Sequence, residues 1–391
     1  MSLNAARIER IKLKDLPALA AAVVNGAAPD TFIPITKHRA IAHIHNPYAE
    51  PDDVALLLAQ EGDRNVGYFG LMPVMLQHEG KLHKVHWLTT WAVAPDYLGK
   101  GLGSQLMEAA VAVDGDLAIV GSKPARRIAN KYGFREVKTL HYVRIDFGVA
   151  GRSNPAGSFL RAIRKILAVF RVRINIDRVD RPIARFFDLL FAPLLRPWLI
   201  GGLARKAGST EKTIRMQRVQ QVKPGTWQMG QRTGFYRGIE VVNWMLAHPW
   251  VLPSGQSESE RLNYGFTDAR LGFEVSGWQL SAESGESLGF VCFQSSRING
   301  RIVLKVLDYQ LAPTSPSLLA VALQQARGVR ADIMEGPAEL AEPLRGSRLE
   351  RLLVRRRQRT LQVHLRSGDS PMARAWPHIE QSYCDGDMAF T

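Results

Sequence analysis

The sequence predicts a mixed α/β protein made of two similar domains, and three observations support this prediction. Residues 1–147 alternate strand-like and helix-like apolar patterns in the order β-α-α-β-β-β-α-β-α-β-β. Residues 219–391 repeat the order β-β-β-α-β-α-β. A chain of 391 residues is too long for one ordinary core and suits two or three domains. We therefore expect two mostly antiparallel twisted sheets, each flanked by helices, with residues 148–218 as a connector.

The elements of the first domain follow from its apolar periodicity. Strands are expected at Arg7–Leu13, Val54–Gln60, Val66–Gln77, Val85–Val93, Leu117–Val120 and Phe134–Phe147. Helices are expected at Asp15–Val24, with Asp15 as a suitable N-cap, and at Lys37–His45, Gly103–Val113 and Ala125–Tyr132. Strict alternation along Val85–Val93 would place Trp87, Thr89 and Trp91 on one face of that strand.

The second domain repeats this pattern and suggests an ancient duplication. Strands are expected at Phe273–Ser281, Ser287–Gln294, Arg301–Gln310, Ala331–Met334 and Arg359–Leu365, and helices at Ser317–Gly328 and Pro337–Leu344. The segment from Leu311 to Ser317 contains no glycine, so no phosphate-binding loop is visible there. No such loop is therefore expected to hold an anion in this half, which could supply specificity or form an interface.

Most of the net charge of +15 comes from the connector. Residues 151–218 hold 15 basic and 4 acidic residues, whereas residues 1–150 and 219–391 each carry a net charge of +2. An interdomain connector with a solvated basic face is the favoured interpretation. The alternative is a helix lying on an anionic membrane surface, because the run from Phe186 to Ile200 is too interrupted to span a bilayer. Nucleic-acid binding is not expected, because few aromatic residues are interleaved with the basic ones.

Cysteine content and the amino terminus favour a cytoplasmic protein, with the inner face of the membrane as a peripheral alternative. Only Cys292 and Cys384 are present, which excludes a disulfide framework or a zinc site, and no secretory signal pattern opens the chain. The terminal run from Cys384 to Asp387 could be imagined as a metal or acceptor site, but an Asp-Gly turn is favoured. We expect no metal, and the oligomeric state is not indicated.

The segment Val93–Ser104 carries the strongest chemical signal. A strand ends at Val93, Pro95 ends the ladder, and a loop with three glycines then opens directly into a helix. Glycines let the backbone approach a ligand closely, and free N–H groups at a helix N-terminus favour a phosphate. Lys100 adds positive charge. The pattern therefore predicts a strand–loop–helix cradle for an anion, whereas the antiparallel hairpins that precede it disfavour a Rossmann loop or a P-loop.

In this context the segment resembles the acetyl-CoA-binding motif of the GNAT acyltransferase superfamily, V-x-P-x-x-(R/Q)-x-x-G-x-(G/A). The matching positions are Val93, Pro95, Gly101 and Gly103, and downstream Ala125, Gly133 and Phe134. The resemblance covers residues 1–147 and agrees with the predicted element order. By the same resemblance, residues 219–391 are expected to form a degenerate GNAT-like domain that does not bind CoA in the usual way and could supply acceptor specificity. The resemblance implies an acyltransferase that uses an acyl-CoA, expected to be acetyl-CoA, and an amine of a small molecule or peptide as acceptor. If residues 151–218 lie on a membrane, the alternative is a peripheral acyltransferase that acts on envelope or polysaccharide precursors.

The resemblance also implies how CoA would bind. The pyrophosphate would lie on the backbone N–H groups of Leu98, Gly99, Lys100, Gly101, Leu102, Gly103 and Ser104. The pantetheine arm would pair with the strand edge from Trp91 to Val93. A backbone N–H near Val93 would then face the acyl carbonyl as an oxyanion donor.

Several working positions of the family are replaced. Leu98 stands where the family has Arg or Gln, Ser122 where it has Asn, and Ala129 where many members have the Tyr that protonates the thiolate. Trp87 and Thr89 occupy the positions of the usual general base.

Three options remain open for the reaction. They are slow transfer by positioning alone, a base from another segment (His43, His45, His141 or Asp96), or a silent CoA-binding or scaffold protein. Because the first domain has no cysteine, direct attack of the acceptor on the thioester is the expected mechanism.

Overall fold

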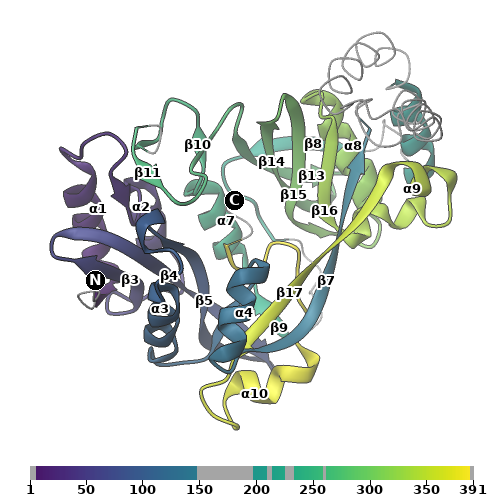
Figure 1. The fold of residues 1–391 in the computed structure, drawn as a ribbon. Coiled ribbons are helices and arrows are strands. Elements are labelled where there is room, and N and C mark those ends of the chain that lie inside the picture. The colour runs from purple at the N-terminus through teal and green to yellow at the C-terminus, as the bar shows by residue number, and fades with distance from the viewer. Residues whose placement is uncertain (1–5, 148–196, 209–213, 225–232, 259–260, 388–391) are drawn as a thin grey trace, which may run out of the picture.

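The computed structural model describes residues 6–147, 197–208, 214–224, 233–258 and 261–387. Within this part of the chain, one 13-stranded sheet runs through the whole molecule in the order β1-β3-β4-β5-β6-β17-β7-β16-β15-β14-β13-β8, with β9 paired to β4 (Figure 1). Two of its described pairings are parallel, β5 with β6 and β15 with β16, and the rest are antiparallel. The predicted fold class, a mixed α/β protein with mostly antiparallel strands and flanking helices, is confirmed. The two expected sheets, however, are joined edge to edge into one.

The first half follows the predicted element order closely. Its strands are β1 (Arg7–Lys12), β2 (Phe32–Ile33), β3 (Val54–Glu61), β4 (Arg64–His78), β5 (Lys81–Val93), β6 (Leu117–Ile119) and β7 (Arg135–Asp146), and its helices are α1 (Leu16–Val24), α2 (Lys37–Ile44), α3 (Leu102–Val111) and α4 (Lys123–Lys131). Short 3-10 turns lie at Leu13–Asp15 and Pro95–Tyr97. Asp15 is the N-cap residue of α1, but its side chain makes no capping hydrogen bond.

The second half begins beyond the connector. Its strands are β8 (Arg215–Val219), β9 (Gly234–Tyr236), β10 (Leu252–Pro253), β11 (Asn263–Tyr264), β12 (Ala269–Arg270), β13 (Glu274–Ser281), β14 (Ser287–Ile298), β15 (Arg301–Leu311), β16 (Ile333–Pro337) and β17 (Val354–His364), and its helices are α7 (Ile239–Ala247), α8 (Leu318–Gly328), α9 (Arg348–Leu353) and α10 (Pro371–Ala375). The helix expected at Pro337–Leu344 is a 3-10 helix, Ala338–Leu344, and the last strand begins five residues earlier than expected.

Strands β7 and β17 join the two halves by exchanging places. The last strand of the first half, β7, pairs with β16 of the second half, whereas β17 inserts between β6 and β7. Each half therefore completes its sheet with a strand from the other, and Figure 1 shows β7 and β17 as a long ribbon between them. That residues 1–147 and 219–391 form separate domains stays a prediction.

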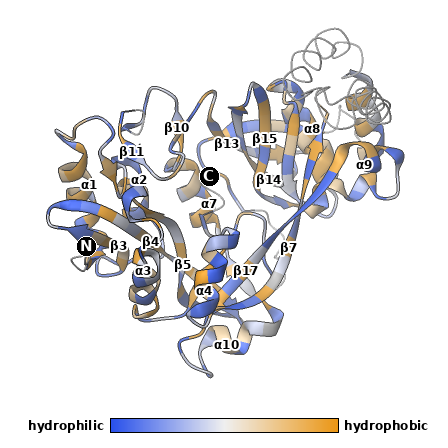
Figure 2. Ribbon diagram, viewed as in Figure 1, coloured by the Kyte–Doolittle hydropathy of each residue, from blue (hydrophilic) through white to orange (hydrophobic). Residues whose placement is uncertain are grey.

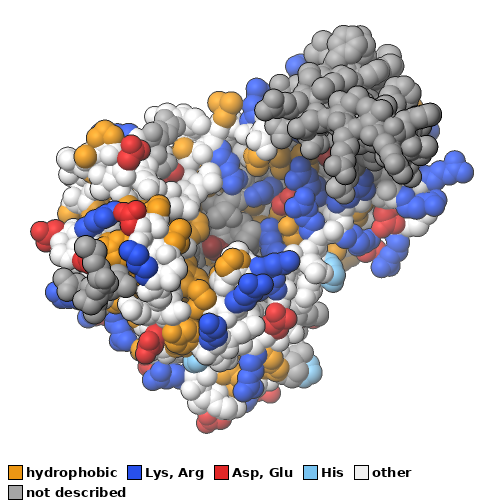
Figure 3. Space-filling model, in the orientation of Figure 1, with side chains coloured by type: hydrophobic (Ala, Val, Ile, Leu, Met, Phe, Trp, Pro, Cys, Tyr) orange, Lys and Arg blue, Asp and Glu red, His pale blue; other side chains and the backbone are white. Residues whose placement is uncertain are grey.

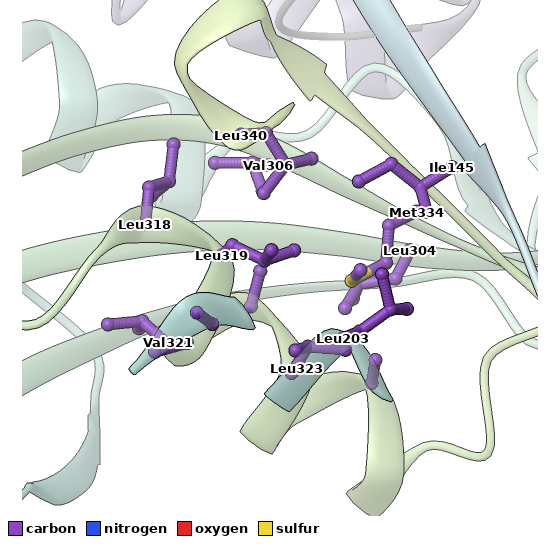
Figure 4. Packing of buried hydrophobic residues seen from close by; sticks show 14 of the residues in the cluster. Ile145, Leu203, Leu304, Val306, Leu318, Leu319, Val321, Leu323, Met334 and Leu340 are labelled. Carbon is purple, nitrogen blue, oxygen red and sulfur yellow. The ribbon is translucent and has the colours of Figure 1, made fainter. Parts of the chain in front are cut away.

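Hydrophobic clusters line both faces of this sheet. The largest packs α8 against β7, β15, β16 and β17, and Figure 4 shows Leu319 and Leu323 of α8 near Leu304 and Met334 of the sheet. A central cluster around Trp87, Phe235 and Trp250 contains residues of both halves. In Figure 2, α1 and α8 are largely hydrophobic, whereas α4 is largely hydrophilic, because most of its side chains are not buried.

The predicted alternation along β5 is wrong beyond Thr89. Tyr68 pairs with Ala92 and Gly70 with Thr89, so Thr90 and Trp91 together face one residue of β4, a β-bulge, and Thr90 takes a positive φ of 40°. Trp91 consequently packs in the cluster under α3, whereas Trp87 lies in the central cluster. The bulge separates Trp87 and Thr89 from Trp91, which alternation had placed together.

Most of the basic connector, residues 148–196, lies outside the described residues, so the membrane-surface alternative for it stays a prediction. Among the described helices, none is long and apolar enough to cross a membrane.

Candidate active site

The loop between β5 and α3 forms the predicted anion cradle. Gly99 and Gly101 adopt positive φ values of 76° and 86°, which glycine reaches without strain, and Gly101 is the N-cap of α3. The amides of Leu98, Lys100 and Ser104 donate to carbonyls within the segment Pro95–Gly101. No backbone carbonyl of the described residues accepts from the amides of Gly99, Gly101, Leu102 or Gly103. Four of the seven expected N–H groups are therefore available at a helix N-terminus, where an anion is favoured.

Two cationic side chains lie near this loop, both beside Tyr97. Lys100 Nζ lies 5.2 Å from the centre of the Tyr97 ring, and the Arg64 guanidinium lies 5.9 Å from the same ring. Arg64 also pairs with Asp96 at 3.0 Å on the surface. The Leu98 side chain, which replaces the family's Arg or Gln, is 66% exposed and offers no polar group. The charge near the cradle therefore comes from Lys100 and Arg64 and not from position 98.

An open strand edge lies next to the cradle. The parallel pairing of β5 with β6 ends at Trp87 and Ala118, whereas β5 continues to Val93. On this side of the sheet the stretch Leu88–Val93 has no strand partner in the described residues. The side chain of Trp91 is stacked on Phe69 at 4.7 Å, so its indole serves the core while its backbone stays at the edge. An extended amide-bearing ligand can pair with such an edge.

The thiolate-protonating Tyr has no substitute at the expected position of α4. Ser122 caps this helix through the Ala125 amide, and Ala129 is fully buried in the cluster beneath α3. Tyr132 follows the last turn of α4 and packs partly against that cluster. Ser122 therefore caps the N-terminus of α4, but position 129 of this helix has no hydroxyl that could protonate the thiolate.

A carboxylate from the C-terminal segment contacts the two β5 residues that stand where the family has its base. Asp387 accepts a hydrogen bond from the Thr89 hydroxyl at 2.8 Å and one from the Trp87 indole N–H at 3.2 Å. Gly386 makes this approach possible, because its φ is 63° and a Cβ atom there would overlap the Trp87 ring. Burial raises the pKa of Asp387 above its ordinary value, although the two donors oppose that shift.

The four bases considered from sequence lie elsewhere. His43 is buried against Trp250, and burial together with Arg39 lowers its pKa to about 3. His45 stacks on His248 at 4.3 Å, and Asp96 is held by Arg64 on the surface. His141 lines a separate cavity between the halves. Sequence reasoning missed Asp387 because the terminal Asp-Gly-Asp run looks like an ordinary turn, and nothing local indicates that it returns to β5.

Comparison with known proteins identifies the class of the first half. Residues 22–134 match the model of the acetyltransferase (GNAT) family. These residues form a GNAT domain, and they include β3 to β6, the cradle and α4. The first half therefore contains a domain of the N-acetyltransferase class, whose members generally use an acyl-CoA as cosubstrate and an amine as acceptor.

Similar solved structures span both halves of the chain. A GCN5-related N-acetyltransferase from Anabaena variabilis ATCC 29413 is 10% identical with a TM-score of 0.42, covering 92% of this chain and 73% of that one. A conserved protein from Enterococcus faecalis V583, described as a probable N-acyltransferase, is 10% identical with a TM-score of 0.44, covering 93% and 73%. A putative acetyltransferase from Pyrococcus horikoshii is 13% identical with a TM-score of 0.39, covering 99% and 98%. No curated protein matches the sequence.

Proposed function

We propose that this protein transfers an acetyl group from acetyl-CoA directly to an amine, with Asp387 as the general base. The observation that carries the proposal is the combination of a four-amide cradle after β5 with the open edge of Leu88–Val93. The cradle suits the CoA pyrophosphate, and the edge suits the two amides of pantetheine. This arrangement supports binding at Trp91, Val93 and the segment Leu98–Ser104, in which Gly99, Gly101, Leu102 and Gly103 supply the donors.

The proton of the acceptor explains the role proposed for Asp387. An amine with a pKa near 10.4 is only about one part in a thousand unprotonated at pH 7. The Asp387 carboxylate lies on β5 beside Thr89, and its raised pKa makes it a stronger base than an exposed aspartate. It accepts the amine proton as nitrogen attacks the thioester carbonyl, and the carbon–sulfur bond then breaks.

The leaving group needs less help than the nucleophile. A free thiol has a pKa of about 8.5, so a departing thiolate is tolerable near neutral pH without a dedicated acid. This agrees with the absence of a hydroxyl at Ala129. The proposed chemistry therefore needs one base and a positioned thioester.

Isothermal titration with acetyl-CoA tests the cosubstrate proposal. We expect saturable binding by the wild-type chain and at least tenfold weaker binding by Gly101→Val, because valine cannot adopt the φ of 86° without strain. Gly300→Val is the matched control, since Gly300 has a similar φ of 79° in a turn of the second half and open space around it. Absence of binding at millimolar acetyl-CoA by folded protein would refute the proposal.

A silent CoA-binding protein is the second candidate, and the vacant acid position at Ala129 and the apolar Leu98 favour it. Thiol release measured against amines, amino sugars and peptides distinguishes the two. Turnover that depends on the added amine excludes the silent protein, whereas acetyl-CoA binding without any turnover supports it.

A further inference from the structure

The C-terminal segment, residues 380–387, runs from β9 to β5 and is held at both ends. At its start, Glu380 forms a bridge with Gly234 of β9. At its end, Asp387 accepts a hydrogen bond from the Thr89 hydroxyl of β5 at 2.8 Å. The residues between these two ends therefore decide where the Asp387 carboxylate lies.

Two arginine side chains hold successive carbonyl groups in the middle of this segment. Arg359 of β17 donates through Nη1 to the Tyr383 carbonyl at 3.1 Å. Arg237, which follows β9, donates through Nη1 to the next carbonyl, that of Cys384. Hydrogen bonds from a charged donor are about twice as strong as those between neutral groups. The two guanidinium groups therefore fix the path of the chain shortly before Asp387.

Arg359 is also held between two aromatic rings. Its guanidinium lies 4.4 Å from the centre of the Tyr142 ring on β7 and 5.0 Å from that of Tyr383, where a cation is attracted to the ring face. The Tyr383 hydroxyl donates to Glu335 of β16 at 2.7 Å. Burial raises the pKa of Tyr383 well above its ordinary value, so this donor stays protonated. Arg359 thus holds both the ring and the carbonyl of Tyr383.

Close packing does not hold this part of the segment on every side. Residues 380–384 line a cavity of about 460 Å³, together with Leu307 and Pro337 among others. Protein interiors resist movement because their side chains are close-packed, and that resistance is missing along a cavity. Hydrogen bonds and ring contacts, rather than packing, therefore set the position of the segment beside the cavity.

A turn carries this position on to the carboxylate. The Ser382 amide donates to Asp385 Oδ2 at 2.6 Å, and the Asp385 amide donates to the Ser382 carbonyl at 3.3 Å. Gly386 follows with a φ of 63°. An Asp side chain that bonds a nearby backbone amide stabilises such a turn. A shift of Tyr383, which lies inside the turn, therefore moves Asp387.

We propose that Arg359 is a positioning residue for acetyl transfer, which holds Tyr383 so that the Asp387 carboxylate stays beside Thr89. The inference rests on the proposed function, because it takes Asp387 as the general base. Misplacement of a catalytic group by about 1 Å can cost about 10²-fold in rate. The second half would then act on the reaction without a contact to CoA, since β6 separates β17 from β5.

A neighbouring arginine supplies a matched control. Figure 3 shows Lys and Arg side chains gathered where the two halves meet, so charge in this region is not special to one residue. Arg357 lies two residues before Arg359 on β17, so both side chains share one face of the strand. Arg357 is exposed, whereas Arg359 is partly buried against its two rings. Arg357→Gln therefore removes the same charge from an exposed position.

Steady-state kinetics test the proposal. We expect Arg359→Gln to lower kcat by about 10–10²-fold while the KM for acetyl-CoA changes less than twofold, because the cradle and the β5 edge are untouched. Arg357→Gln should change neither value by more than twofold. Arg359→Lys keeps a positive charge and a donor, so it should recover at least a third of the wild-type kcat.

A double variant tests whether Arg359 acts through Asp387. Adding Arg359→Gln to Asp387→Asn should cause no further loss of kcat, because the effects of two residues that act as one unit do not add. Tyr142→Leu removes one of the two rings and should lower kcat less than Arg359→Gln does. It also tests the same contact if Arg359→Gln does not fold.

Alkylation of Cys384 by iodoacetamide, followed by mass spectrometry, tests the contact without any catalysis. The Cys384 side chain is 2% exposed, and burial raises the pKa of its thiol to about 12, so it should react slowly in the wild type. We expect Arg359→Gln to speed this labelling at least tenfold. Cys292 of β14 is fully buried and serves as the internal control, whose labelling should change less than twofold.

Three results would overturn the inference. They are a kcat of Arg359→Gln within twofold of the wild type, a further large loss when it is added to Asp387→Asn, and labelling of Cys384 that does not rise or rises equally with that of Cys292. Wild-type kcat in Asp387→Asn refutes the base and the catalytic role of Arg359 together. Faster labelling of Cys384 alone would then still show that Arg359 holds the segment.

Discussion

The sheet has two gaps of the same kind, one beyond the end of the β5/β6 pairing and one beyond the end of the β15/β16 pairing. In each, a parallel pair of strands ends, the first strand continues with an open edge, and a helix follows: α3 after β5 and α8 after β15. The connecting loops differ. The first contains two left-handed glycines and four available amides, whereas the second runs through Pro313 and Pro316 and contains no glycine.

The N-terminus of α8 is used for packing. The Ser317 hydroxyl accepts from the Ala320 amide and donates to the Ala207 carbonyl, so a chain segment lies where an anion would bind. The same strand–loop–helix arrangement thus forms an anion cradle in the first half, whereas in the second half the helix N-terminus is capped by Ser317 and covered by another chain segment. Function in this fold depends on the loop after the strand and on the side chains that line the gap.

The largest effect is expected from the carboxylate at the first gap. Asp387→Asn should lower kcat by about 10²–10⁴-fold at pH 7, because general-base assistance is typically worth that much. Acetyl-CoA affinity should be unchanged, which titration measures. Asp114→Asn is the control, since that side chain is 96% exposed. A variant with wild-type kcat would exclude Asp387 as the base.

The pH profile sharpens this prediction. Because the pKa of Asp387 is raised, kcat/KM should fall as the pH drops through a value above that of an ordinary aspartate. The carboxylate is the active form, so activity is retained above that pKa and lost below it. The acidic limb of the profile should disappear in Asp387→Asn, and its persistence would assign it to another group.

A variant at Arg237 tests whether contacts with the second half hold the C-terminal segment, here called the tail, that carries Asp387. The Arg237 guanidinium pairs with Asp308 at 2.8 Å and donates to the Cys384 carbonyl, largely shielded from solvent. Arg237→Leu leaves Asp308 without its partner and should cost about 3–5 kcal/mol of the free energy of unfolding, measured by urea denaturation. Arg345→Leu, an exposed pair with Glu342, should cost about 1 kcal/mol or less. Equal effects would show that the buried pair does not secure the tail.

Sequence reasoning succeeded where the pattern is local and failed where distant segments meet. The cradle was predictable because Gly99, Gly101 and the start of α3 are neighbours in the chain. The exchange of β7 and β17 was not, because each strand has the same alternating pattern whichever neighbour it pairs with. Asp387 reaches Thr89 across 298 residues, a contact set by the path of the tail. The bulge at Thr90 is equally invisible, since it depends on register with β4.

The smallest effect is expected from the cap of α8. Ser317→Ala removes a side-chain acceptor at a helix N-terminus and should cost about 1 kcal/mol of stability, seen as a lower midpoint of urea denaturation. Acetyl-CoA affinity should not change, because this terminus is covered by the segment that ends near Ala207. Ser122→Ala removes the corresponding cap of α4 and should cost a similar amount. A change in acetyl-CoA affinity with Ser317→Ala would show that the second gap also takes part in CoA binding, and the contrast between the two loops would then fail.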